Sequence, residues 1–372
     1  MDASSYLLSA LATLGVLGVA GLLALVHRRI TGITGSSGGA GSSGSADGAG
    51  SISPRFWRGA LVAGGTACLV ALATFPLTAA PPLYCAPVAA LGALFGVLAT
   101  APLRARSHIQ WSVALVSTLS TALVFTPAAA LSFGIHTDQL NDQNGTGVGL
   151  IDFSGALPGL IAGGCVALGY LAFRSVARGV RATKRNSRAA EPSTLSWRAL
   201  IPVSVLLVVG SLAWSLGLEL AVDGYLGLIA GTVLLMAAGG LVGGVIIERV
   251  HRRQNTPAGS LLGLLAGLAA SAPASASLTP VIAFVSALVI GGLCALLPRS
   301  GPTAVLSTLV VASSASLLAL GALAANMSFI YTGQPEVLFT QASALLPIAA
   351  GGLVWGALVQ FVLGRLAPRD PA

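Results

Sequence analysis

The stretch FRSVARGVRATKRNSR, residues 173–188, places six basic side chains directly after the long apolar run that begins at Phe153. Along the whole chain, all lysines and arginines fall in every second gap between apolar stretches, and the charged residues of the other gaps are all acids. Basic residues of membrane proteins collect in the cytoplasmic loops. The alternation therefore predicts a protein that crosses a membrane many times in a fixed orientation.

The composition agrees with a membrane protein, because 372 residues that are 55% hydrophobic and 8% charged do not form an ordinary water-soluble domain. A helix needs about 20 apolar residues to cross the hydrocarbon layer. Eleven stretches meet this need, at residues 6–26, 57–79, 84–103, 110–133, 153–173, 199–218, 225–247, 259–276, 279–297, 302–325 and 341–363. We therefore expect an all-α polytopic membrane protein whose single transmembrane domain covers residues 1–372.

The charges also predict the orientation of these eleven spans. Basic residues follow the odd-numbered spans: Arg28, Arg29, Arg55, Arg58, Arg104, Arg106, Arg174, Arg178, Arg181, Lys184, Arg185, Arg188, Arg198, Arg249, Arg252, Arg253, Arg299, Arg365 and Arg369. The other gaps hold Asp2, Asp138, Asp142, Glu219, Asp223 and Glu336. The N-terminus is therefore expected outside and the C-terminus inside. The net charge of +8 reflects this topology and contact with the lipid bilayer, so no nucleic-acid partner is expected.

Two cytoplasmic segments are expected to lack a fold of their own. Residues 31–53 form a Gly/Ser-rich, flexible loop, and residues 174–198 form a basic loop. The basic loop sets topology and contacts lipid, with a protein partner as the alternative. The first span has no basic residues before it, so we interpret it as a retained helix and not a secretory signal. Lys184 is the single lysine beside many arginines, alanines and glycines, which favours a bacterial plasma membrane.

Metal, cofactor and enzyme sites are not expected. The four cysteines have no ligand-like spacing, and all four histidines fall outside the predicted spans: Cys68, Cys85, Cys165 and Cys294; His27, His108, His136 and His251. An intramembrane hydrolase would need a Ser–His or paired-Asp arrangement within the spans. We therefore expect a protein that is not an enzyme.

Small residues four apart predict closely packed helices, as in the pairs Gly159/Gly163, Gly227/Gly231, Gly239/Gly243, Gly240/Gly244 and Gly263/Gly267. Prolines within the apolar stretches would kink or open the spans, or serve as plain packing kinks; these are Pro76, Pro127, Pro158 and Pro347.

Four stretches, in this order along the chain, resemble the Amt/Rh ammonium transporter family. They are DASSYLLSALATLGVLGVAG (2–21), VFTPAAALSFG (124–134), LIDFSGALPGLIAGG (150–164) and ERVHRRQNTPAGSLLGLLAGLAASAPAS (248–275). The third is similar to the family's fifth-helix entry, an Asp-Phe-Ala-Gly-Gly run leading into a Gly-rich helix. The resemblance implies two inverted five-helix halves, an eleventh C-terminal helix and a homotrimer. An odd number of helices in each half requires that inversion.

Several family positions are altered in this chain. The resemblance places Leu160 and Leu309 where the family has its two pore histidines, one on helix five and one on helix ten. Phe133 matches the aromatic at the outer mouth, a cation-π surface. The stacked phenylalanine gate falls near Ala90 or Leu91 and near Leu216, where the family's Phe-Asn-Ala-Gly-Ser run appears as LGLEL (216–220).

Two polar features leave alternatives open. Asp152 is interpreted as an N-cap of the fifth helix, with cation attraction at the outer mouth as the alternative. The hydroxyls of the tenth span bond to backbone or line the pore; they are Ser307, Thr308, Ser313, Ser314 and Ser316.

The leading hypothesis is a divergent Amt-like channel that passes ammonia, ammonium or another small neutral species through an apolar central pore. The alternative is a transport-silent relative that acts as a sensor or as a structural subunit of a trimer. The tail after the last span is short, so regulation by PII-type proteins is not expected.

Overall fold

The structure, a computed structural model, describes residues 3–31, 54–104, 110–134, 150–177, 196–298, 301, 303–325 and 328–366, and these residues form helices and connections without any strand. The helices of at least eight residues are α1 (Ala3–Thr31), α2 (Pro54–Thr74), α3 (Cys85–Ala99), α5 (Gln110–Ser120), α6 (Thr126–Phe133), α7 (Gly163–Ala177), α8 (Trp197–Leu218), α9 (Tyr225–Arg252), α10 (Pro257–Ala274), α11 (Pro280–Ala295), α12 (Ala304–Leu323) and α14 (Glu336–Leu366). Short helices are α4 (Ala101–Arg104) and α13 (Phe329–Thr332). The predicted loop at 31–53 and most of that at 174–198 lie outside the described residues.

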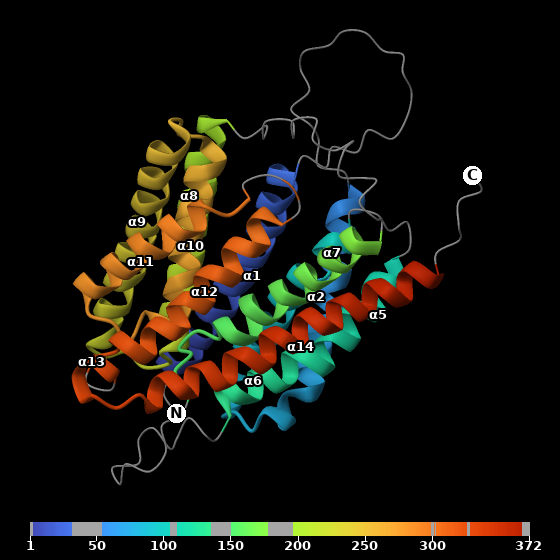
Figure 1. The fold of residues 1–372 in the computed structure, drawn as a ribbon. Helices are drawn as coiled ribbons and strands as arrows, with labels where there is room; N and C mark the ends of the chain where they lie inside the picture. The colour runs from blue at the N-terminus through green and yellow to red at the C-terminus, as the bar shows by residue number, and fades with distance from the viewer. Residues whose placement is uncertain are drawn as a thin grey trace.

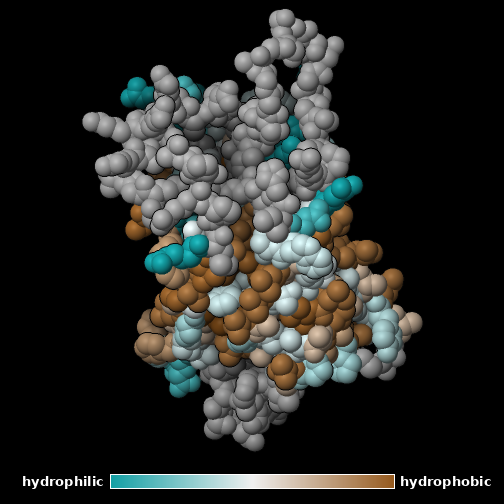
Figure 2. Space-filling model, turned by 90° about the vertical axis from the view of Figure 1, so that its right-hand side faces the viewer, coloured by the Kyte–Doolittle hydropathy of each residue, from teal (hydrophilic) through white to brown (hydrophobic). Residues whose placement is uncertain are grey.

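Ten helical spans in the described part of the chain are long and apolar enough to cross a membrane, and α11 is a shorter apolar helix. Figure 2 shows hydrophobic side chains over the middle of one face, with hydrophilic residues above and below them. Large apolar side chains are exposed on α5 and α14, among them Trp111, Phe339 and Val354. An exposed apolar surface of this extent suits contact with lipid acyl chains. The prediction of an all-helical, multi-pass membrane protein is confirmed, whereas eleven spans and the orientation stay predictions.

The two halves of the chain repeat the same helix contacts. In the first half α2 packs on α3 and α5, and in the second half α9 packs on α10 and α11. Likewise α3 packs on α7 as α10 packs on α12. Figure 1 shows α1 and α8, the first helices of the halves, side by side and running in opposite directions. The last helix, α14, lies along α7. This arrangement agrees with two five-helix units and an added helix.

Proline breaks the helical pattern at three of the four predicted places. Pro127 follows a π-helical segment, Thr121–Phe125 (η3), which separates α5 from α6. Pro158 lies inside a second π-helical segment, Leu157–Ala162 (η5), which leads into α7. Pro76 lies in the 3₁₀ turn Phe75–Thr78 after α2, whereas Pro347 lies within the unbroken α14. A proline lacks the N–H of a regular helical hydrogen bond, so it widens or ends a turn.

Glycines allow α9, α10 and α11 to pack backbone to backbone. A Cβ on Gly240 of α9 would collide with the backbone of Gly267 on α10, and a Cβ on Gly291 of α11 would collide with Gly240. Gly227 and Gly231, also on α9, would meet nothing within 4 Å. The predicted close packing therefore applies to four of the five spaced pairs, and the pair Gly227/Gly231 faces open space.

We expect Gly240→Ala to destabilise the fold and Gly231→Ala, on the same helix, to leave it unchanged or slightly more stable. The added methyl group at Gly240 forces two helices apart, which costs about 1–3 kcal/mol. At the open Gly231 position, alanine gains about 0.5–1 kcal/mol because glycine is a poor helix former. Thermal unfolding of the detergent-solubilised protein, followed by circular dichroism, measures both. Equal Tm shifts for the two variants would contradict the packing described above.

Candidate functional site

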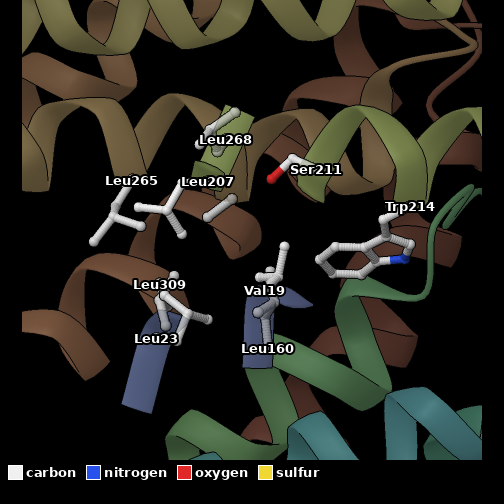
Figure 3. Close-up of a pocket in the computed structure, with 10 residues that line it drawn as sticks. Val19, Leu23, Leu160, Leu207, Ser211, Trp214, Leu265, Leu268 and Leu309 are labelled. Carbon is white, nitrogen blue, oxygen red and sulfur yellow. The ribbon is translucent and has the colours of Figure 1, made fainter. Parts of the chain in front are cut away.

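Leu160 and Leu309 lie in the same small cavity at the centre of the bundle, although they are far apart in sequence. Leu160 comes from η5 and Leu309 from α12, and each side chain is 2% exposed. The cavity has a volume of about 10 Å³, enough for about one water-sized molecule. We call it the leucine cavity (Figure 3), and its lining is Val19, Leu23, Leu160, Leu207, Ser211, Trp214, Leu265, Leu268, Ala269 and Leu309.

The lining is almost wholly apolar and comes from both halves of the chain. Helix α1 and segment η5 contribute from the first half, and α8, α10 and α12 contribute from the second. The Ser211 hydroxyl and the Trp214 indole N–H are the polar side-chain groups among the lining residues. No lining side chain titrates, so the cavity offers an uncharged, water-poor environment.

Trp214 is a residue of the cavity lining that the sequence did not single out. Its indole lines the leucine cavity, and its Nε1–H donates a hydrogen bond of 3.0 Å to the carbonyl oxygen of Ser154. In Figure 3 the indole lies at one side of the group, with Val19 and Leu160 between it and Leu309. Leu216, expected near the gate, is not in the lining and is partly exposed.

Shifting the comparison with the Phe-Asn-Ala-Gly-Ser run by two residues gives an alternative match on α8. The shifted comparison places Trp214 at the phenylalanine and Gly217 at the glycine of that run. Gly217 lies where α8 crosses α1, and a Cβ there would collide with the backbone N of Ala12. The aromatic residue three positions before a glycine was the available sequence signal. Trp214 therefore offers an aromatic side chain close to the expected α8 gate position, and Leu216 at the gate stays a prediction.

Asp152 caps the segment that carries Leu160. Its Oδ1 accepts a 2.8 Å hydrogen bond from the Ala156 N–H, and its Oδ2 accepts bonds from the Leu157 N–H at 2.9 Å and the Ser132 hydroxyl at 2.8 Å. Burial raises the pKa of the Asp152 carboxyl, and the three donated hydrogen bonds oppose this rise. The side chain is 4% exposed, so the geometry favours the capping interpretation over cation attraction.

The backbone just after Asp152 joins the two halves of the chain. The N–H of Phe153 donates to the carbonyl of Pro273 at 3.4 Å, and that of Ser154 donates to the carbonyl of Ala272 at 3.0 Å. Both acceptors lie at the end of α10. Together with the Trp214–Ser154 bond, these contacts fix the entry to η5 against the second half.

Phe133 is buried and not an open aromatic surface. Its ring stacks at 5.6 Å between centroids on Tyr84, and it is 6% exposed. Gly155 has a φ of 71°, and a Cβ on it would lie 2.7 Å from both Leu91 Cδ1 and Phe133 Cζ. Phe133 and Leu91 thus pack over the entry to η5, whereas Ala90 is buried elsewhere in α3 and does not line the leucine cavity. The expected cation-π surface at Phe133 is covered.

The hydroxyls of α12 bond to backbone and do not line the leucine cavity. Ser307 and Thr308 donate to the carbonyl of Ala304 one turn earlier, at 3.2 and 2.9 Å. Ser313 and Ser316 donate across to α10, to the carbonyls of Ala269 at 3.1 Å and Ala270 at 2.6 Å. Ser314 is partly exposed and is also absent from the lining. The backbone-bonding interpretation is therefore the one that the geometry supports.

Two histidines are not where the sequence placed them. His27 lies within α1 and is 5% exposed, because α1 continues as a helix beyond the predicted end of the first span at residue 26. His251 is exposed in the last turn of α9. His108 and His136 lie outside the described residues. The expectation that all histidines are in loops is therefore wrong for His27 and His251, which both lie within helices, and of these two His27 is the buried one.

No family model matches the sequence, and no curated protein matches it. Among solved structures, a protein titled "Sensor Amt Protein" superposes with a TM-score of 0.74 at 17% identity, covering 98% of this chain and 95% of that chain. The chain has the fold of the Amt ammonium transporters.

Two fungal structures with the Amt fold agree. Mep2 of Saccharomyces cerevisiae superposes with a TM-score of 0.74 at 16% identity, covering 98% of this chain and 88% of that chain. Mep2 of Candida albicans gives a TM-score of 0.74 at 14% identity, covering 98% and 85%. The resemblance seen in the sequence is confirmed at the level of the Amt fold.

Proposed function

We propose that this chain is a divergent Amt-like channel that passes ammonia, or another small neutral molecule, through the leucine cavity. The observation that carries the proposal is the meeting of Leu160 and Leu309 in one central cavity, from opposite halves of the Amt fold. We further propose that it works as a homotrimer in a bacterial plasma membrane, with eleven spans, the N-terminus outside and the C-terminus inside. It has no enzymatic role in this proposal.

The apolar lining favours a neutral molecule over a cation. An ammonium ion in the leucine cavity would lose its hydration and meet no charged or titratable side chain, which costs several kcal/mol or more. Ammonia loses far less on leaving water because it carries no net charge. The cavity would therefore conduct without net charge movement.

The proposal is tested by two measurements on protein reconstituted in lipid vesicles. Stopped-flow recording of internal pH should show ammonia entry above that of protein-free vesicles, while a solid-supported membrane should give no ammonium-evoked current. Leu160→Phe should fill the leucine cavity and return ammonia entry to the lipid background. Leu346→Phe, at an exposed position on α14, is the matched control and should not change entry. A saturable ammonium current in the unmodified protein would contradict neutral passage.

The alternative is a transport-silent protein that acts as a sensor or as a structural subunit of a trimer. The closed geometry favours it, because the cavity measures only about 10 Å³ and the Trp214 indole lies at one side of it. One of the proteins with the same fold is itself titled a sensor. Ammonia entry equal to the lipid background, in vesicles shown to contain folded protein, would support this alternative.

A further inference from the structure

His27 is a buried polar side chain that the leucine cavity itself does not explain. The ring is 5% exposed, and neither Nδ1 nor Nε2 has a hydrogen-bond partner within the described part of the chain. Buried polar groups are nearly always hydrogen-bonded, and an unpaired one destabilises the fold. Such a group is therefore a candidate for binding something that the protein itself does not supply.

The position of His27 continues the cavity lining along α1. Val19 and Leu23 line the leucine cavity, and His27 follows Leu23 by four residues. Residues four apart share one face of a helix, and one such step advances about 6 Å along the axis. The His27 ring therefore lies next in line after Leu23, toward the end of α1 that carries Arg28 and Arg29.

Trp214 lies at the other end of the same face. Helix α8 runs antiparallel to α1, and a Cβ on Gly15 would meet the backbone N of Trp214, while one on Gly210 would lie 3.0 Å from Val19 Cγ2. Trp214 is thus level with Gly15, and Val19, Leu23 and His27 follow in order. Along this face of α1, the cavity-lining residues Val19 and Leu23 therefore lie between the level of the Trp214 indole and that of the His27 imidazole.

Arg104 determines which kind of molecule suits the His27 ring. Burial lowers the pKa of Arg104 to about 10, so the guanidinium stays charged at neutral pH. It is close enough to interact electrostatically with the His27 ring. A cation beside the ring would be repelled by this charge, whereas a neutral molecule would not.

We propose that the His27 ring binds a small neutral molecule that both donates and accepts hydrogen bonds, at the end of the leucine cavity remote from Trp214. Under the proposed function, on which this identification rests, the molecule is ammonia. A neutral imidazole offers one N–H donor and one acceptor nitrogen, which matches such a molecule. Water has the same hydrogen-bonding chemistry, and the experiment separates the two.

The direct test is nuclear magnetic resonance of the full-length protein in lipid nanodiscs, with ¹⁵N-labelled histidine. Four histidines give few signals, and the spectrum of His27→Phe assigns those of His27. Ammonium chloride at constant pH should shift the His27 ring-nitrogen signals to a saturating limit, and the exposed His251 signals should not follow. Potassium chloride at the same concentration is the control, because its cation is close in size to ammonium. It should shift neither set of signals, because potassium does not form a neutral molecule that can hydrogen-bond to the ring. Unchanged His27 signals in ammonium chloride, the result for a site held by water, would overturn the proposal.

A second measurement uses ammonia entry into vesicles. His27→Leu should slow entry about fivefold, the effect of losing one hydrogen bond. His27→Gln should restore part of it because an amide also donates and accepts, and His251→Leu should have no effect. The Tm of His27→Leu should not fall, since leucine removes an unpaired polar group, so a slower entry is not a sign of unfolding. Wild-type entry in His27→Leu would overturn the role in transport. If neither the unmodified protein nor any variant raises ammonia entry above that of protein-free vesicles, the proposal of a channel is contradicted. The shifts of the ring-nitrogen signals then still decide whether His27 binds ammonia.

Discussion

Trp214→Ala is expected to raise ammonia entry into vesicles about tenfold over the unmodified protein, which corresponds to a barrier lower by about 1.4 kcal/mol. The indole occupies the end of the leucine cavity level with Gly15 and bonds to the Ser154 carbonyl at the entry to η5. Alanine leaves the space of the indole empty and enlarges the cavity at this end. The same change should lower the free energy of unfolding by about 3–5 kcal/mol, the usual effect of emptying a buried aromatic site.

Two control variants separate the loss of the ring from the loss of its hydrogen bond. Trp214→Phe keeps an aromatic ring but cannot donate to Ser154, so entry should stay near the unmodified level with a loss of stability of about 1 kcal/mol. Trp111→Ala removes a tryptophan that is 84% exposed on α5 and should change neither quantity. If Trp214→Ala gave the same ammonia entry as the unmodified protein, the Trp214 indole would not be the group that limits passage.

The fold follows from the sequence to the extent that it depends on hydrophobic length and charge position. The length of the apolar stretches and the alternation of basic gaps predict long helices in alternating directions. In the hydrocarbon layer the backbone N–H and C=O groups must bond to one another, which a helix achieves within a single segment. Helix ends were less predictable. The apolar pattern predicts that the first span ends at Val26. Helix α1 instead continues to Thr31, because Val26, His27 and Ile30 are still buried within the bundle. That difference of a few residues moved His27 from a loop to a buried position.

The candidate site was predictable where a motif fixed the register. Asp152 and the Gly-rich run after it form a continuous motif, and counting along it reached Leu160, which lines the leucine cavity. On α8 the run that resembles the family is only five residues long. A shift of two residues in its alignment decides whether Leu216 or Trp214 matches the family's phenylalanine. Because a helix turns 100° per residue, such a shift moves a side chain to the opposite face.

The orientation of α12 could not be predicted from the sequence. Its hydroxyls and leucines are spread around the helix, so no face is clearly apolar. Only the close contact with α10 determines that Ser313 and Ser316 bond to the carbonyls of Ala269 and Ala270. Leu309 is consequently left to face the cavity. Contacts between helices distant in sequence decide which side chains line the site.

Asp152→Ala should cause a large loss of stability, about 3 kcal/mol or more in the free energy of unfolding. The carboxylate accepts bonds from two backbone N–H groups at the start of η5 and from the Ser132 hydroxyl, all of them buried. Losing an N-cap costs about 1 kcal/mol, and each buried donor left without a partner adds about 1–3 kcal/mol. Asp152→Asn keeps one acceptor oxygen and should lose less. Thermal and denaturant unfolding measure the series.

Asp223 provides the control for Asp152, because its carboxylate also accepts a hydrogen bond from a backbone N–H at the start of a helix, but in water. Its Oδ1 accepts a 2.9 Å bond from the N–H of Tyr225 at the start of α9, and the group is exposed. Asp223→Ala should cost about 0.5–1 kcal/mol, since water replaces the lost acceptor. If Asp152→Ala cost no more than Asp223→Ala, the Asp152 carboxylate would not be needed to hold η5. Its alternative role, attraction of cations at the outer mouth, would then have to be measured through ammonia entry.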